Sequence, residues 1–230
     1  MISDIRQQLQ KIKTFSEEEC ARFYKTGAGE YAEHDRFLGI SVPNLRKIAK
    51  QNDLLTWPNI QTLIESPFNE ERLLALLILV NRFQKNKSEQ HVIYNFYLKN
   101  IKQVNNWNLV DASAHWIMGA YLFRKNKTIL TTLSKSSVLW ERRIAIVATG
   151  YFIRQNELTP TIKISTLLLH DENDLIHKAV GWMLREMGKR DMSRLIYFIE
   201  KHAHTMPRTM LRYAIEKFPL QKRQQYLKLK

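Results

Sequence analysis

The sequence predicts an all-α protein whose helices form an α-solenoid of helical repeats. Three observations predict this class. The chain holds only 7 glycines and 6 prolines in 230 residues, which leaves few sites for the tight turns of a many-stranded β fold. Apolar residues recur at helical spacing, and no stretch alternates as a half-buried strand does. Small residues also recur at nearly constant intervals along the predicted helices.

The N-terminal segment is expected to hold an amphipathic helical region at 3–25, which ends at Gly27 and Gly29. A polar loop is expected at 31–39. Ser41 is then interpreted as the N-cap of the next helix, because its hydroxyl can accept a hydrogen bond from the first turn.

Asn69 and Ser88 are interpreted as N-caps of two later helices, and the central helix is expected at 107–123. A short basic tail is expected to end the chain at Lys230. The other predicted helices follow the spacing of apolar residues and lie at 58–65, 70–84, 88–99, 128–134, 138–154, 161–169, 173–188, 191–203 and 206–217.

Alanines mark the repeat. They lie near the same point of successive helices, at positions 75, 112, 145, 179 and 214, at intervals of 37, 33, 34 and 35 residues. Helix pairs that recur about every 30–45 residues are typical of an α-solenoid. We therefore predict one HEAT-like repeat domain over residues 1–230. The alternative is an irregular helical bundle in which the spacing is a coincidence.

The charge of the chain favours a polyanionic partner. Lys and Arg number 36 against 22 Asp and Glu, which gives a net charge of +14. Stacked repeats would line basic residues along a concave groove suited to duplex DNA; the alternative for each is a solvated helix face. The basic residues that precede the repeating alanines are Arg72, Arg142, Arg143, His177, Lys178 and Arg212.

Composition argues against several other classes. The single cysteine, Cys20, allows no intramolecular disulfide, and residues 1–13 do not resemble a signal peptide. The longest apolar run, 73–80, is too short to span a membrane. No nucleotide-binding loop or metal-ligand spacing is present, so no metal or cofactor is expected. We expect a monomeric, cytoplasmic protein associated with the nucleoid.

An acidic residue in the central apolar helix needs an explanation. Trp107 and Asp111 are four residues apart, so they share a helix face, and a buried aspartate is costly unless it is paired or open to a cleft. Asp111 could be structural, paired with Arg143 or capping a neighbour. It could instead be a functional carboxylate. Farther along, one helix face carries Lys178, Trp182 and Arg185.

These segments resemble the AlkD family of HEAT-like-repeat DNA alkylation repair proteins, over nearly the whole chain. The Trp-x₃-Asp element of Trp107 and Asp111 and the Gly-Trp-x₂-Arg element at 181–185 are the most specific parts. Further similarity lies at 37–40, 105–114, 140–147, 174–186 and 206–213. Position 108 departs from the family, since it is Asn where relatives often have Asp.

The resemblance implies a DNA glycosylase that releases N3- and N7-alkylated purines from double-stranded DNA, without a cofactor and without inserting the base into a deep pocket. Asp111 would be the catalytic carboxylate, with Trp107 and Trp182 against the sugar. DNA-binding roles would fall to Arg143, Arg185, Lys178, Arg142, Arg212 and Tyr31, the last as the N-terminal aromatic. Two alternatives stay open: a non-catalytic scaffold for distorted or branched DNA, and a protein-binding solenoid.

Overall fold

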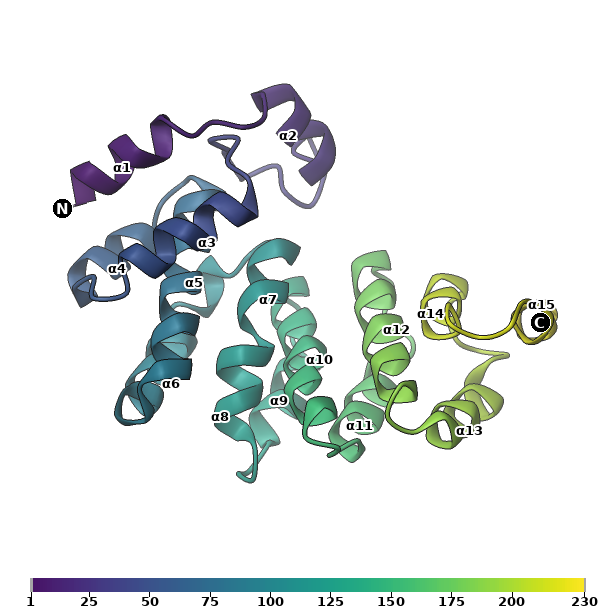
Figure 1. Ribbon diagram of the computed structural model, residues 1–230. Coiled ribbons are helices and arrows are strands. Elements are labelled where there is room, and N and C mark those ends of the chain that lie inside the picture. Colours follow the sequence, from purple (N-terminus) through teal and green to yellow (C-terminus); the bar gives the residue numbers. More distant parts are fainter. Residues whose placement is uncertain (1, 230) are drawn as a thin grey trace. The chain divides into compact units, whose positions relative to one another are not determined.

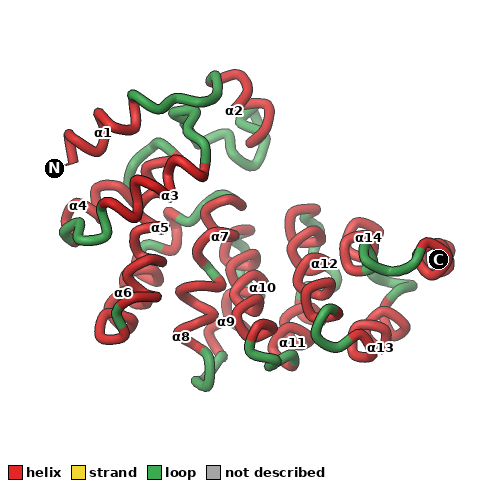
Figure 2. The backbone as a smooth tube through the Cα atoms, in the orientation of Figure 1, coloured by secondary structure: helices red, strands yellow, loops and turns green. Residues whose placement is uncertain are grey.

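The computed structural model describes residues 2–229, which form helices and connecting loops without a β-strand (Figure 1 and Figure 2). One isolated bridge pairs Arg36 with Phe68. The all-α prediction is confirmed. No helix in this part of the chain combines the length and hydropathy needed to cross a bilayer. Backbone contacts divide the chain into two compact units, one ending at Ser113 and the other beginning at Ala114.

The N-terminal unit is built around α5 (Asn69–Lys85). Residues 69–80 of this helix are all buried, and α3, α4, α6 and α7 each pack against it. A helix buried on every side needs no polar stripe, which explains its nearly continuous apolar run. The surrounding helices are α1 (Ile2–Gln10), α2 (Glu17–Tyr24), α3 (Val42–Gln51), α4 (Trp57–Ile64), α6 (Gln90–Lys99) and α7 (Trp107–Ser113), with short 3₁₀ turns η1 (Lys87–Glu89) and η2 (Ile101–Gln103).

The C-terminal unit packs neighbour on neighbour. A π-helical turn, η3 (His115–Gly119), contacts α10, α10 contacts α12, and α12 contacts α14; α10, α12 and α14 stand side by side in Figure 1. This order is that of an α-solenoid, as predicted. The helices are α8 (Ala120–Leu122), α9 (Thr128–Leu133), α10 (Leu139–Arg154), α11 (Thr159–Leu167), α12 (Asp174–Gly188), α13 (Met192–His202), α14 (Arg208–Ala214) and α15 (Leu220–Lys228).

Small residues set the close approaches between these helices. The repeating alanines on α5, α10, α12 and α14 are buried, and Ala112 is half-buried. Three glycines of the C-terminal unit, spaced 31 residues apart, also lie where neighbouring helices approach closely. A Cβ on Gly119 would lie 2.2 Å from the Ala148 carbonyl oxygen, and one on Gly181 would lie 2.5 Å from that of Met210. Glycine at positions 119 and 181 therefore lets the next helix approach to backbone contact. A Cβ on Gly150 would lie 3.3 Å from the Met183 sulfur, so Gly150 faces a side chain of α12.

Some helix boundaries differ from the predictions. The region 3–25 holds two helices, and Ser16 caps the second through a capping box with Glu19. Ser41 lies at the predicted N-cap of α3, although its side chain makes no capping hydrogen bond. The central helix is not continuous over 107–123, because η3 interrupts it.

Two predicted caps are wrong, and the predicted basic tail contains a helix. Asn69 is the first residue of α5 and sends its side chain into the interior, so Phe68 occupies the cap position. Asn86, not Ser88, supplies the capping oxygen ahead of α6. The basic tail is the helix α15, and Arg208 donates hydrogen bonds to the carbonyls of Leu227 and Leu229 at its end.

Candidate functional site

The predicted catalytic pair lies on the short helix α7. Trp107 is its first residue and Asp111 follows four residues later, so the two side chains project one turn apart. The side-chain oxygen of Asn106 accepts a hydrogen bond from the Trp107 backbone nitrogen at 2.7 Å, which satisfies one free donor at the helix start. Both Trp107 and Asp111 are half-buried. The pair therefore lies on a fixed helix end and keeps some access to solvent.

Three aromatic residues hold the Trp107 indole. Its Nε1 donates a hydrogen bond to the Tyr31 hydroxyl at 3.2 Å. The Tyr24 ring stacks on it with centroids 5.4 Å apart, and the Phe23 ring meets it edge-on at 5.7 Å. Tyr24 in turn stacks on Phe37 at 4.3 Å. The structure thus brings together two residues predicted from distant parts of the sequence, Tyr31 and Trp107.

A buried polar network fixes the start of α7 from behind. The Asp35 carboxylate forms an ion pair with Arg72 and accepts hydrogen bonds from the side-chain amides of Asn69, at 2.8 Å, and Asn106, at 2.6 Å. Asn108 donates to Asn69 at 2.6 Å. All of these residues are buried. Because a buried carboxylate without partners is costly, this network links the loop that carries Tyr31 to the helix that carries Trp107.

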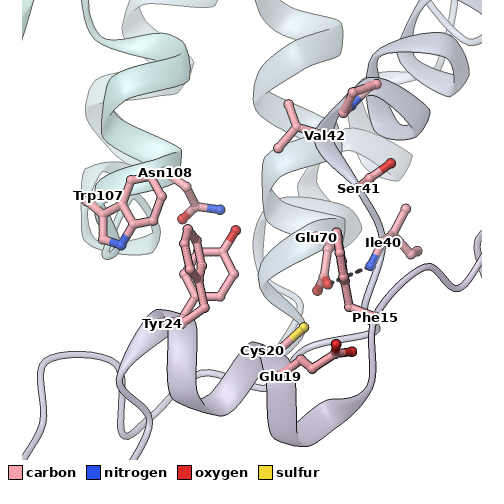
Figure 3. Close-up of a pocket in the computed structure, with 12 residues that line it drawn as sticks. Phe15, Glu19, Cys20, Tyr24, Ile40, Ser41, Val42, Glu70, Trp107 and Asn108 are labelled. Atoms are coloured by element: carbon pink, nitrogen blue, oxygen red, sulfur yellow. Dashed lines mark hydrogen bonds between the residues drawn. The ribbon is translucent and has the colours of Figure 1, made fainter.

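A cavity of about 550 Å³ opens beside Trp107 (Figure 3). Aromatic and apolar side chains dominate its wall, and two carboxylate residues complete it. In the close-up, Tyr24 lies between Trp107 and Glu70, with Cys20 at the base. The lining residues are Phe15, Glu19, Cys20, Phe23, Tyr24, Ile40, Ser41, Val42, Pro43, Glu70, Trp107 and Asn108.

Glu70 shapes one wall of this cavity. Its carboxylate accepts hydrogen bonds from the backbone nitrogens of Leu38, Gly39 and Ile40, at 2.9, 2.8 and 3.2 Å. Gly39 has φ +78°, and a Cβ there would lie 2.1 Å from the Phe15 carbonyl oxygen. Only glycine fits both conditions. The Gly39 carbonyl accepts from the Phe15 nitrogen at 2.9 Å, which places Phe15 at the cavity.

The basic candidates of the C-terminal unit lie on α10, α12 and α14. Arg142 pairs with Asp171, with Nε 2.6 Å from the carboxylate, and also donates to the Ser136 and Ser137 carbonyls at 3.0 Å. Arg143 is buried and donates to the Leu175 carbonyl at 2.6 Å. These contacts tie α10 to the segment that begins α12.

The predicted face of α12 is present. Lys178, Trp182 and Arg185 follow one another at spacings of four and three residues, and the Trp182 and Arg185 side chains are half-buried. Lys178 lies 2.7 Å from Asp174, and this hydrogen bond is the main cause that lowers the pKa of the Asp174 carboxyl. Arg185 pairs with Glu216. Arg212, on α14, is exposed.

The prediction that Arg72 lines the basic groove is wrong. Arg72 is buried and paired with Asp35, so it cannot contact a DNA backbone. Sequence reasoning also missed the network around Asp35. The only signal was the cluster of asparagines at 105, 106 and 108, which the structure shows to be partly internal.

Within residues 2–229, no cluster of three or more His, Cys, Asp or Glu side chains is arranged to hold a metal ion. The His115 imidazole, on η3, is neutral near pH 7. Burial, and to a smaller extent the nearby Arg154 guanidinium, lower its pKa to about 4. The Arg154 guanidinium itself lies over the Trp116 ring, 4.2 Å from its centroid.

Comparison with known proteins agrees with this fold. A solved structure described as a predicted DNA alkylation repair enzyme from Enterococcus faecalis superposes with a TM-score of 0.67, covering 91% of this chain and 98% of that one at 15% identity. No curated protein matches the chain. A family model described as DNA alkylation repair enzyme matches residues 5–218. Because that match spans most of the sequence, the chain belongs to the DNA alkylation repair enzyme family.

Proposed function

We propose that this protein is a DNA glycosylase that hydrolyses the N-glycosidic bond of cationic N3- and N7-alkylated purines in duplex DNA. One observation carries the proposal. Asp111 lies one turn from an indole, Trp107, that Tyr31 and Tyr24 hold in place on a capped helix. Membership of the alkylation repair family supports a substrate of damaged DNA.

The chemistry suits a single carboxylate. An alkylated purine already carries a positive charge, so the C1′–N bond can break with both electrons passing to the base, which leaves neutral. No general acid is then required. The sugar becomes cationic, as in the hydrolysis of other glycosides. A water molecule adds to C1′ and loses a proton, and Asp111 is suited to stabilise the sugar and to orient that water.

The electrostatic stabilisation expected from Asp111 is large enough to change the rate of hydrolysis. A carboxylate about 4 Å from the developing charge, at an effective dielectric constant near 20, attracts it by about 4 kcal/mol. That corresponds to roughly 10³ in rate. Aromatic faces beside the cation add about 0.5–2 kcal/mol each, the role proposed for Trp107 and Trp182.

The basic residues of the C-terminal unit are proposed to contact DNA phosphates. Arg212 is exposed and Lys178 is half-exposed, so a phosphate can compete for them. Arg185 and Arg142 would exchange a carboxylate partner for a phosphate. Arg143, on α10, is buried and donates to the Leu175 carbonyl, so we propose that it supports the start of α12 rather than contacting a phosphate. The protein is proposed to act as a monomer on cytoplasmic, nucleoid-associated DNA.

The test is release of 7-methylguanine and 3-methyladenine from methylated duplex DNA. We expect release by the wild type and a loss of roughly 10³ for Asp111→Asn. Asp53→Asn is the matched control, because Asp53 pairs with Lys85 and lies outside the cavity beside Trp107. Duplex binding without release of either base would refute the glycosylase and leave the scaffold alternative.

A further inference from the structure

A groove between α11 and α13 exposes apolar side chains on the C-terminal unit. Both helices contact α12 and lie next to each other in Figure 1. Tyr197 is 69% exposed, and Met192 and Leu167, on the same two helices, are 44% and 41% exposed. Apolar groups exposed together around a hollow are typical of a surface that binds another molecule. The groove encloses about 330 Å³, and its lining residues are Ile162, Thr166, Asp191, Ser193, Arg194, Tyr197, Phe198, Lys201 and His202.

The spacing of residues along α13 forms one wall of the groove. Ser193, Tyr197 and Lys201 are four residues apart, so they lie one turn after another on one face of the helix. Phe198 also lines the groove, but it is buried, and its ring contacts that of His202 with centroids 4.7 Å apart. The groove therefore has an apolar floor, with the Tyr197 ring and the Lys201 ammonium group on its rim. Such a site suits a peptide that inserts one large apolar side chain.

Positive charge is in excess at the groove. Among its described lining residues Asp191 is the acid, and Arg194 already occupies its carboxylate. That carboxylate accepts a hydrogen bond from the Arg194 backbone nitrogen at 3.0 Å and lies 3.2 Å from the Arg194 Nε. Lys201 is exposed, and so is Lys163 on α11. The rim thus offers ammonium groups that an acidic ligand can reach.

Two titratable neighbours leave this balance unchanged. Burial first, and then Lys201 and His170, lower the pKa of His202, so its imidazole is neutral near pH 7. Burial first, and then Glu200, raise the pKa of Tyr226, which places the Glu200 carboxylate near α15. Glu200 is not among the described lining residues of the groove.

We infer that this groove binds an acidic peptide segment of a partner protein, which inserts one aromatic or aliphatic side chain beside Tyr197 and places carboxylates at Lys201 and Arg194. Complementary charge of this kind selects one partner over others. A second copy of this chain fits less well, because each copy carries +14. Duplex DNA fits less well too, since its phosphates bring nothing apolar to the hollow. None of the residues proposed for catalysis or DNA contact lines the groove, so the inference does not rest on the proposed function.

The test begins with short random peptides, displayed on phage and selected on the immobilised full chain. Because any acidic peptide is attracted to a protein of charge +14, the phage are first depleted on a double variant, Tyr197→Ala with Lys201→Glu. Peptides that survive this depletion and bind the wild type are expected to be rich in Asp and Glu. Each is also expected to carry at least one large apolar residue.

Single variants then locate the binding of a selected peptide, measured by fluorescence anisotropy. Tyr197→Ala and Lys201→Glu are each expected to weaken binding by about tenfold or more, as for anchor residues of an interface. Leu220→Ala is the control for Tyr197, because Leu220, on α15, is an apolar residue of similar exposure, at 66%. Lys50→Glu makes the same change of charge as Lys201→Glu, on an exposed residue of α3. Both controls should bind the peptide as the wild type does.

Several outcomes would overturn the inference. If no peptide survives the depletion, or if the survivors carry no acidic excess, the groove does not bind this class of partner. A larger loss of duplex DNA affinity in Lys201→Glu than in Lys50→Glu would assign the surface to nucleic acid. Self-association of the wild type in sedimentation velocity, lost in Tyr197→Ala, would assign it to a second copy. All four substitutions change exposed side chains, so the fold is expected to be kept in each.

Discussion

Replacing Asn106 with alanine should destabilise the N-terminal unit and disorder the start of α7. Asn106 is fully buried. Its amide nitrogen donates to the Asp35 carboxylate at 2.6 Å, and its oxygen accepts from the Trp107 nitrogen at 2.7 Å. The substitution removes both hydrogen bonds at once. Asp35 keeps its contacts to Arg72 and Asn69, so no carboxylate is left without a partner.

The magnitude follows from the two bonds. A hydrogen bond to a charged group contributes about 1.5–3 kcal/mol, and a helix N-cap contributes about 0.5–2 kcal/mol. We therefore expect the free energy of unfolding to fall by roughly 2–5 kcal/mol. Urea denaturation followed by tryptophan fluorescence measures this change, since Trp107 lies directly beside the altered position.

The neighbouring residue supplies the control. The side-chain oxygen of Asn105 is buried without a hydrogen-bond partner, so Asn105→Ala should cost little, within about 0.5 kcal/mol. If Asn106→Ala costs no more than Asn105→Ala, the two hydrogen bonds of Asn106 do not stabilise the N-terminal unit. The activity assay adds a second readout: a displaced Trp107 should lower base release, whereas Asn105→Ala should leave it unchanged.

Three further predictions concern the C-terminal unit and DNA binding. The pKa of His115 is about 4 in the folded protein against 6.5 unfolded, so as the pH falls the unfolded chain takes up a proton first. The contribution of His115 to stability should be constant above about pH 6.5 and should fall between about 6.5 and 4, a decline that His115→Gln reduces. A Gly181→Ala substitution places a Cβ 2.5 Å from the Tyr213 Cβ and from the backbone of α14, and should lower the melting temperature through a loss of about 1–3 kcal/mol, whereas Ala148→Gly would not clash. If duplex DNA is bound through about 6–10 phosphates, affinity should drop about 10³–10⁵ between about 50 and 200 mM salt; a flat salt response contradicts the role of the +14 charge.

The helices could be predicted because periodicity is a local property. Apolar spacing identified α4 and α10 nearly to their ends, and four of the five recurring alanines mark buried positions on successive helices. The π-helical turn at 115–119 could not be found this way, because nothing in the local pattern distinguishes it from α-helix. Residues 220–228 carry too few apolar groups to signal a helix, and no residue of α15 is buried.

The site was predictable only in part. Trp107 and Asp111 stand out because their spacing and chemistry are visible in one segment. The contact of Trp107 with Tyr31 joins residues 76 positions apart and was not predicted; the resemblance gave Tyr31 only a DNA-binding role. Asn69 was misinterpreted as a cap because a polar residue before an apolar run has that local meaning, whereas its actual partner, Asp35, is 34 residues away. Pairings of this kind depend on tertiary structure.

The evenly spaced glycines Gly119, Gly150 and Gly181 have a consequence for how the C-terminal unit comes apart. Gly119 and Gly181 each face the backbone of the next helix, and Gly150 lies between His115 and Met183, so the unit is held together by contacts between neighbouring elements in a row. Cohesion in such a row is a sum of adjacent junctions. Under rising denaturant the end bearing α14 should therefore exchange its amide hydrogens well before α10 does, and the row should fray inward one junction at a time.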